Sequence, residues 1–312
     1  CQTGFSKPYP FPPGSTTQPV TVVVNGDLTN ESNETFTVNL SGPSNATISD
    51  AQGVGTITND DPVPSITIND VSVTEGNAGT TNANFTVSLS AVSGQIVTVA
   101  YTTANGTAVS PSDYAAAGGT VTFPAGTTSQ TVTVPVNGDL INEASETFTV
   151  NLSVPVNATI GDAQGVGTIL NDDAVPGLSI NDVSISEGNS GTTSANFTVT
   201  LSAASGQTVT ASYSTANGTA TAGSDYVTAS GTVTFPAGTM TQPVSVTVNG
   251  DVTNEPDETF SVNLTSPANA TISDAQGIGT ILNDDPLPTL SVNDVSTTEG
   301  NSGTVSANFT VT

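Results

Sequence analysis

A repeat with a period of 112 residues constrains this chain more than any other feature of its sequence. The tripeptide Asn-Gly-Asp begins at Asn25, Asn137 and Asn249, and these positions are 112 residues apart. The tripeptides Asn-Asp-Asp and Glu-Gly-Asn recur with the same period. Since no insertion or deletion interrupts the period, the chain consists of tandem copies of one folding unit.

Two copies of this unit are complete, and we place them at residues 66–173 and 178–285. Residues 1–61 form a partial copy in which residues 11–61 follow the second half of the unit, and residues 289–312 follow its first strands. We interpret the chain as a window from a longer tandem array, because half of a sandwich exposes unpaired strand edges. The alternative is head-to-tail assembly, in which residues 289–312 of one molecule pair with residues 11–61 of the next.

Residues 1–10 depart from the repeat and contain the chain's one Cys, Cys1, and its one Lys, Lys7. They are interpreted as a boundary segment or a separate leader, and a lipid-modified Cys1 is a third interpretation. Elsewhere apolar and polar residues alternate: Phe197, Val199 and Leu201 share one side of their segment, with Thr residues between them. This period of two is typical of strands that have one buried face.

The fold class predicted from this pattern is all-β, with tandem immunoglobulin-like β-sandwiches of about seven strands each. Turn residues such as Asn217-Gly218 separate the strand-like segments, and none of them shows helical periodicity. Short linkers that contain proline occupy residues 62–64, 174–176 and 286–288. Because proline restricts the backbone, these linkers predict that the sandwiches form a stiff rod.

The charge of the chain excludes several classes of function. It has 27 acidic residues against one Lys, no His, and a formal net charge of −26. One cation cannot replace the counterions of nucleic acid or bind an anionic membrane surface. Sites that need His are excluded because the chain has no His, and disulfide frameworks are excluded because it has one Cys. No apolar run is long enough to span a membrane, and no nucleophile–base pair stands out, so we expect a protein that is not an enzyme.

The acidic residues cluster at four places in each copy. In the first copy these places hold Glu75, Asp113, the segment 139–146 and the pair Asp172-Asp173. All four can meet at one end of a sandwich, and no Lys or Arg is present there to neutralise them. Either these carboxylates spread into water as ordinary turn residues, or they hold a cation. An all-oxygen set of this size suits Ca²⁺ best, whereas Zn²⁺ and Cu²⁺ prefer His or Cys ligands.

Five motifs in the second copy together resemble the Calx-beta domain. They are Glu187-Gly-Asn, residues 218–226 (GTATAGSDY), residues 231–238 (GTVTFPAG), residues 251–260 (DVTNEPDETF) and Asn283-Asp-Asp. The resemblance implies an immunoglobulin-like sandwich that binds Ca²⁺ at the end where its last strand finishes. By position, it implies the following ligands: Glu75, Asp113, Asp139, Glu143, Glu146, Asp172 and Asp173 in the first copy, and Glu187, Asp225, Asp251, Glu255, Glu258, Asp284 and Asp285 in the second.

The sequence departs from the fullest family pattern at two places. Gly138 and Gly250 precede the turn Asp where a further acid can stand, and Asn171 and Asn283 begin what is often an Asp triplet. Fewer acids imply one or two ions per site, or weaker binding. The N-terminal half-copy lacks the first Glu and the loop Asp. It keeps Asp27, Glu31, Glu34, Asp60 and Asp61.

Asp70 and Asp182 occur early in each copy, close to the linker that follows the preceding copy. We expect Asp182 to help bridge the junction after Asp173, so that Ca²⁺ would stiffen the rod. The predicted function is a calcium-binding structural or adhesive protein at the cell surface. Its expected partners are neighbouring copies, other surface proteins or glycans. The Calx-beta family is also known from the regulatory loop of sodium/calcium exchangers, so the resemblance implies an alternative: an intracellular Ca²⁺ sensor that regulates an attached transporter.

Overall fold

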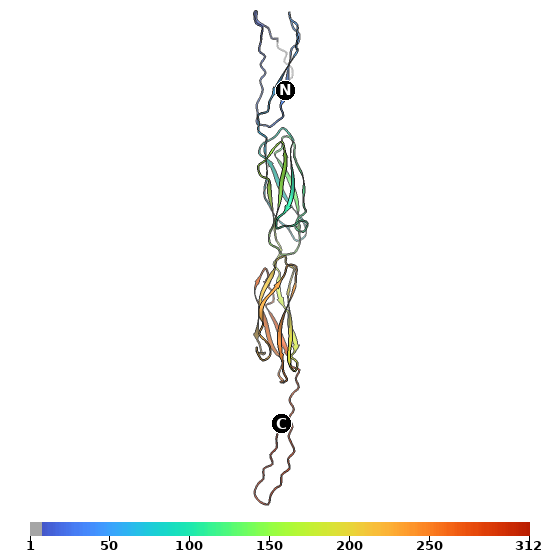
Figure 1. Cartoon of the computed structure of the whole chain (residues 1–312), viewed down its shortest axis with the longest axis vertical. Coiled ribbons are helices and arrows are strands. Elements are labelled where there is room, and N and C mark those ends of the chain that lie inside the picture. The colour runs from blue at the N-terminus through green and yellow to red at the C-terminus, as the bar shows by residue number, and fades with distance from the viewer. Residues whose placement is uncertain (1–7) are drawn as a thin grey trace. The chain divides into compact units, whose positions relative to one another are not determined.

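The computed structural model describes residues 8–312, and the regular elements of this part of the chain are all β-strands (Figure 1). The predicted all-β class is therefore confirmed. Among the described residues no helix is long and apolar enough to cross a membrane. The interpretations of Cys1 and Lys7 concern residues 1–7, which lie outside the described residues.

Each complete copy contains nine strands at equivalent positions. In the first copy they are β3 (Ser65–Ile68), β4 (Val71–Thr74), β5 (Gly79–Leu89), β6 (Val97–Asn105), β7 (Gly118–Phe123), β8 (Ser129–Gly138), β9 (Glu146–Val156), β10 (Thr159–Ile160) and β11 (Gln164–Leu170). In the second copy they are β12 (Gly177–Ile180), β13 (Val183–Ser186), β14 (Gly191–Leu201), β15 (Val209–Asn217), β16 (Ser230–Phe235), β17 (Thr241–Gly250), β18 (Glu258–Ala268), β19 (Thr271–Ile272) and β20 (Gln276–Leu282).

Two sheets make up each sandwich. In the second copy the strand orders are β17-β14-β12-β19 and β13-β20-β18-β15-β16, and the first copy repeats both orders with β8-β5-β3-β10 and β4-β11-β9-β6-β7. In the described part of the N-terminal half-copy, residues 8–61, the strands are β1 (Glu34–Asn39) and β2 (Gln52–Ile57), which pair antiparallel. In residues 289–312 a single bridge joins Val292 and Val311.

The first predicted strand of each copy is divided between the two sheets, which adds one strand to the expected seven or so, and the two-residue strands β10 and β19 add another. In the second copy, β12 pairs antiparallel with β14, whereas β13 pairs parallel with β20. Asn181 and Asp182 lie at the change of sheet. Their side chains accept hydrogen bonds from the backbone N–H groups of Thr198 (2.6 Å) and Ile278 (2.7 Å), so they satisfy donors that the interrupted strand leaves unpaired.

An aromatic cluster fills the core of the second copy. Phe260 is 1% exposed, stacks on Tyr226 with ring centroids 4.7 Å apart, and meets Phe197 edge to face at 6.0 Å. Gly279 is required beneath this ring, because a Cβ there would lie 2.4 Å from Phe260 Cζ. Burial of each such side chain contributes about 1.5–3 kcal/mol, so this cluster stabilises the sandwich from which the acidic loops project.

The chain divides into two compact units. One comprises Cys1–Val73, Asn82–Val136 and Thr147–Thr168, and the other comprises Thr74–Thr81, Asn137–Glu146 and Ile169–Thr312. The second unit thus contains the whole second copy together with the loops that carry Glu75, Asp139 and Asp173 of the first copy. All acidic segments of the second copy therefore lie within one unit.

Candidate metal centre

Strand pairing brings the acidic segments of the second copy together. β13 and β20 run parallel and end in register at Ser186 and Leu282, so Glu187 and the segment that begins at Asn283 leave the sheet side by side. β14 and β17 pair as far as Gly191 and Gly250, which places Asp251 beside the same loop. A Cβ on Gly250 would lie 2.1 Å from the Gly188 carbonyl oxygen, so a residue other than glycine would force the loops apart.

The inner group consists of Glu187, Asp284 and Asp285. Each contributes one carboxylate oxygen, and these oxygens lie within 4.8 Å of one another. Glu187 is 7% exposed and Asp285 5% exposed, whereas Asp284 is exposed. The Gly188 N–H donates to Asp284 Oδ1 (3.2 Å), and the Asn189 amide donates to Asp285 Oδ1. Asp285 Oδ2 is buried and has no hydrogen-bond partner.

A buried carboxylate oxygen without a partner is costly, because nothing replaces the water that folding removes from it. Burial raises the pKa of Glu187 above its ordinary value, and the negative charges of Asp251, Asp285, Glu255 and Asp284 raise it further. No Lys, Arg or His occurs among residues 8–312 to offset this repulsion. The inner group therefore stores charge repulsion that a cation would relieve.

The outer group consists of Asp225, Glu255 and Glu258, whose carboxylate oxygens also lie within 4.8 Å of one another. The pKa of Glu258 is raised to about 7. Burial is the largest cause, and a hydrogen bond with Asp225 and nearby negative charges raise the pKa further. Burial alone would raise the pKa of Asp225. Hydrogen bonds from the Thr221 N–H (2.6 Å), the Ser224 side chain and Glu258 instead lower it. The pKa values of the two carboxyl groups are thus moved in opposite directions, that of Glu258 upward and that of Asp225 downward.

Two asparagines hold the segments of the site in place. The side-chain amides of Asn254 and Asn283 donate to the Asp285 carbonyl at 2.7 and 3.1 Å, and Asn283 Oδ1 accepts from the Glu255 N–H at 3.2 Å. The sequence interpretation treated Asn283 only as a missing acid and did not consider Asn254. The signal was the recurrence of both asparagines with the 112-residue period, at Asn142 and Asn171.

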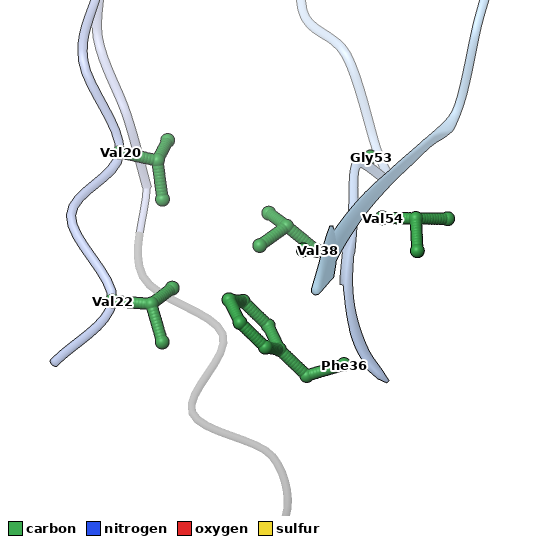
Figure 2. A pocket seen from close by; sticks show the side chains of 7 residues that line it. Val20, Val22, Phe36, Val38, Gly53 and Val54 are labelled. Carbon is green, nitrogen blue, oxygen red and sulfur yellow. The ribbon is translucent and has the colours of Figure 1, made fainter. Parts of the chain in front are cut away.

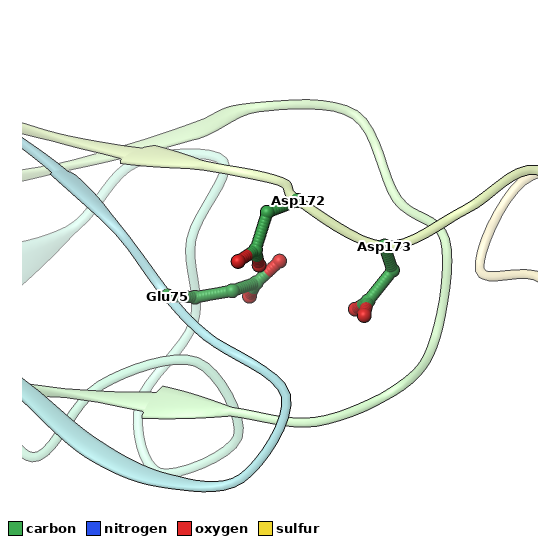
Figure 3. A group of neighbouring side chains, drawn as sticks. All are labelled: Glu75, Asp172 and Asp173. Carbon is green, nitrogen blue, oxygen red and sulfur yellow. The ribbon is translucent and has the colours of Figure 1, made fainter.

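The first copy repeats the inner group with Glu75, Asp172 and Asp173 (Figure 3). Glu75 projects from the segment after β4 toward the two Asp side chains that follow β11. Asp173 is 8% exposed; its Oδ1 accepts from the Asn77 amide (3.0 Å) and its Oδ2 has no partner. Burial raises the pKa of Glu75 to about 7, aided by the charges of Asp139, Asp173, Glu143 and Asp172. Burial likewise raises the pKa of Asp173.

The other predicted ligands of the first copy lie on loops with their own hydrogen bonds. Asp139 Oδ1 accepts from the Ile141 N–H (2.7 Å), and the Glu143 N–H donates to Asn171 Oδ1 (3.0 Å). Glu146 begins β9. Asp113 belongs to the other compact unit, where its carboxylate accepts from the Val109 N–H (2.6 Å).

Asp70 and Asp182, predicted at the junction, lie at the change of sheet in each copy. Asp70 Oδ1 accepts from the Val166 N–H (2.7 Å), as Asp182 does from Ile278, so both have partners within their own repeat. A role at the junction stays a prediction. In the N-terminal half-copy, Asp27, Glu31, Glu34, Asp60 and Asp61 line a cavity of about 110 Å³, and no third carboxylate completes a close group there among the described residues.

Comparisons with known proteins relate the chain to one domain family. The sequence profile described as the Calx-beta domain matches residues 8–70, 58–174 and 170–285. Among solved structures, CBD12 from CALX1.2 is 19% identical, with 70% of this chain and 99% of that chain covered and a TM-score of 0.35. The calcium binding domain CBD12 of CALX1.1 is 23% identical. The match covers 65% of this chain and 80% of that chain, with a TM-score of 0.33. No curated protein sequence matches the chain.

Proposed function

The chain belongs to the Calx-beta domain family, and from that premise we propose that its repeats bind Ca²⁺ at their acidic ends and serve as calcium-stabilised structural modules. In the second repeat, Glu187, Asp284 and Asp285 would hold one ion, and Asp225, Glu255 and Glu258 would contribute to a second. Asp251 lies close enough to raise the pKa of Glu187, and its negative charge would help to stabilise the ion held by the inner group.

The observation that carries this proposal is the buried, unpartnered Oδ2 of Asp285, which recurs at Asp173. Each of these atoms lies in a group of three carboxylates whose oxygens are within 4.8 Å. The donors are all hard oxygens, which favours Ca²⁺ over softer metals. Ca²⁺ also accepts six to eight oxygens in flexible geometry, whereas Mg²⁺ demands a nearly ideal octahedron and keeps much of its water.

Thermal unfolding in millimolar Ca²⁺, in chelator and in Mg²⁺ tests the proposal. Carboxylate-rich extracellular modules bind Ca²⁺ with Kd values of about 10⁻⁴–10⁻³ M. At ten times Kd one such site adds about 1.4 kcal/mol, which raises the melting temperature of a domain of this size by several degrees. Equal melting temperatures in Ca²⁺ and in chelator would contradict the proposal, and an equal shift in Mg²⁺ would contradict the choice of ion.

The structural and adhesive role at the cell surface is the finer part of the proposal. A Thr-rich surface without Lys or Arg in residues 8–312 offers no trypsin sites, which suits exposure outside a cell. Weak sites also match millimolar extracellular Ca²⁺ better than the low concentrations of the cytosol. Neighbouring copies, other surface proteins or glycans would be the partners, and calcium-stiffened repeats in a rod would form the scaffold. We expect no catalysis.

An intracellular Ca²⁺-sensing regulatory module of a transporter is the alternative. It would need Ca²⁺ affinity in the range of about 10⁻⁷–10⁻⁵ M that intracellular sensors use. The near-identity of the two complete copies favours equal structural units over a sensor with two diversified sites. Titration of each site with Ca²⁺ distinguishes the two roles, since submicromolar affinity would favour the sensor and submillimolar affinity the scaffold.

Head-to-tail strand complementation is a second candidate, favoured by the apolar surface of the half-copies. In residues 11–61, Val20, Val22, Phe36 and Val38 line an open groove (Figure 2). Their counterparts Val132, Val134, Phe148 and Val150 in the first copy are buried. In residues 289–312, Phe309 is 62% exposed, whereas its counterpart Phe197 is fully buried. Analytical ultracentrifugation tests this candidate: Phe309→Asp would abolish concentration-dependent assembly, and a monomer at all concentrations would contradict it.

A further inference from the structure

Asp257 is an exposed acidic residue of the second repeat that belongs to neither carboxylate group of the metal centre. It lies in the loop between Glu255 and Glu258, both of which are members of the outer group. Its Oδ1 instead accepts a hydrogen bond from the Asn283 N–H (3.0 Å). Asp257 is thus bonded to a residue of the site without contributing an oxygen to either group.

Asn283, the partner of Asp257, connects the two carboxylate groups. Its Oδ1 accepts from the N–H of Glu255, a member of the outer group (3.2 Å). Its amide donates to the carbonyl of Asp285 (3.1 Å), a member of the inner group that has the buried unpartnered oxygen. Together with the bond to Asp257, Asn283 is held at three points. Rotation of this asparagine would therefore displace segments that carry both groups.

The N-terminal half-copy forms the same bond without a charge. Asn33 occupies the position of Asp257, and its Oδ1 accepts from the Asn59 N–H (2.9 Å). Asn59 in turn accepts from the Glu31 N–H (3.0 Å) and donates to the Asp61 carbonyl (3.1 Å). Because a neutral amide replaces the carboxylate here, the feature that the two occurrences share is an acceptor for the asparagine N–H, and not a negative charge.

The first repeat lacks this acceptor. The counterpart of Asp257 is Ser145, and within the part of the chain that the structure describes no hydrogen bond joins the Ser145 side chain to the Asn171 N–H. Asn171 still accepts from the Glu143 N–H (3.0 Å) and donates to the Asp173 carbonyl (3.2 Å). The asparagine of the first repeat is therefore held by the same two side-chain bonds, without the third.

We propose that Asp257 is a positioning residue of the metal centre in the second repeat. Through Asn283 it holds the segments that carry Glu255 and Asp285 at the spacing that binds a cation. Residues that orient metal ligands without touching the metal commonly contribute about 10–100-fold to metal affinity. Ser145 leaves the first repeat without this support, so an acceptor introduced there raises its affinity. This inference rests on the proposed Ca²⁺ binding.

Asp257→Ala and Asp257→Asn in the full chain test this role. The site of the first repeat is disabled with Glu75→Gln and Asp173→Asn, so that calorimetric titration with Ca²⁺ follows the second repeat. Asp257→Ala removes the acceptor and lowers the Ca²⁺ affinity about tenfold. Asp257→Asn keeps an acceptor oxygen, as Asn33 does, and restores most of that affinity. A role through charge alone would instead make the two losses equal, and added salt would reduce both.

The first repeat provides the matched control at Ser145. The site of the second repeat is disabled with Glu187→Gln and Asp285→Asn, so that the titration follows the first repeat. Ser145→Ala leaves the Ca²⁺ affinity unchanged, because it removes no bond to the Asn171 N–H. Ser145→Asn supplies an acceptor for that N–H and raises the affinity.

Hydrogen exchange tests the bond itself, without the ion. In chelator the Asn283 N–H exchanges faster in the Asp257→Ala variant than in the unmodified chain, because the N–H loses its acceptor. Asp257→Asn restores the slow exchange. Since Asp257 is exposed, the melting temperature of the second repeat in chelator stays close to that of the unmodified chain, so the lost affinity does not come from general destabilisation.

The outcomes separate this inference from the proposed function. If the second repeat binds no Ca²⁺ before Asp257 is changed, the proposed function fails and the inference with it. If the second repeat binds and Asp257→Ala leaves its affinity unchanged, or Asp257→Asn loses as much affinity as Asp257→Ala, the inference alone is overturned. An unchanged affinity with Ser145→Asn, or a loss with Ser145→Ala equal to that of Asp257→Ala, also overturns it.

Discussion

The side-chain amide of Asn189 donates a hydrogen bond to one carboxylate oxygen of Asp285, and the other oxygen of that buried carboxylate has no partner. The asparagine thus fixes the orientation of a charge that nothing else in the second repeat neutralises. A loop that keeps such an arrangement without a cation is under electrostatic strain, and the first repeat duplicates it with Asn77 and Asp173.

Asp285→Asn separates the electrostatic strain from the metal-binding role. In chelator we expect the second repeat to gain about 1–3 kcal/mol of unfolding free energy, because one buried like charge is removed. In millimolar Ca²⁺ its stabilisation by the ion should be lost. Differential scanning calorimetry in both buffers measures the two effects. Asp274→Asn, which removes an exposed charge in the turn between β19 and β20, should change neither.

The raised pKa values of Glu75 and Glu258, both about 7, predict an unusual dependence of stability on pH. A carboxyl group with a folded-state pKa above its unfolded value binds protons more tightly when folded. The unfolding free energy in chelator should therefore fall as pH rises from about 4.5 to 7, by up to about 3 kcal/mol for Glu75, and then level off.

Urea unfolding at pH 5 and pH 8 in chelator checks this trend. Glu75→Gln should remove the part of the decrease that comes from Glu75, whereas Ca²⁺ affinity should increase over the same pH range because protons and the ion compete for the same carboxylates. Greater stability in chelator at pH 8 than at pH 5 would contradict the assignment of these groups.

Gly167 makes the core of the first repeat sensitive to one methyl group. A Cβ at this position would lie 2.4 Å from Phe148 Cζ, and Phe148 is itself stacked on Tyr114. Gly167→Ala should therefore destabilise the repeat by about 1–3 kcal/mol through overpacking. Chemical denaturation measures the loss. Gly161→Ala in the same repeat meets only ordinary contacts at 3.4 Å or more and should cost far less unfolding free energy. If the two variants lose the same unfolding free energy, the Phe148 ring moves aside and the predicted overpacking is wrong.

Much of the site could be predicted from the sequence because its parts lie at strand ends. Once the alternating pattern indicated a sandwich, Glu187 and Asp284 had to follow strands, and the strands end at the same edge. The division of the first strand at Asn181 and Asp182 could not be predicted. It depends on which sheet each half joins, and both halves show the same apolar alternation.

The supporting asparagines were missed for a related reason. Asn142 and Asn254 lie in polar loops where amide residues are common, and their role becomes visible only when the loop is folded against the Asp173 or Asp285 carbonyl. The hydrogen bond between Asp225 and Glu258 could not be predicted either, since the two residues are distant in sequence and their contact depends on loop geometry.

Asp182 provides the last test, because the structure and the sequence suggest different roles for it. Its carboxylate accepts the Ile278 N–H at the change of sheet, whereas the sequence interpretation made it a ligand at the junction. Asp182→Ala leaves that N–H without its partner and should cost about 1–2 kcal/mol of unfolding free energy in chelator. Asp182→Asn keeps an acceptor oxygen and should restore most of this stability, which denaturation in chelator would measure.

The two variants also differ in what they imply for the ion. If Asp182 acts only at the change of sheet, the Ca²⁺ affinity of the first repeat is the same in the Asp182→Asn variant as in the unmodified chain. If it is a junction ligand, the loss of its charge lowers that affinity even though the fold is intact. Titration of the first repeat, with the site of the second disabled by Glu187→Gln, decides between them, because the amide retains the hydrogen bond and removes only the charge.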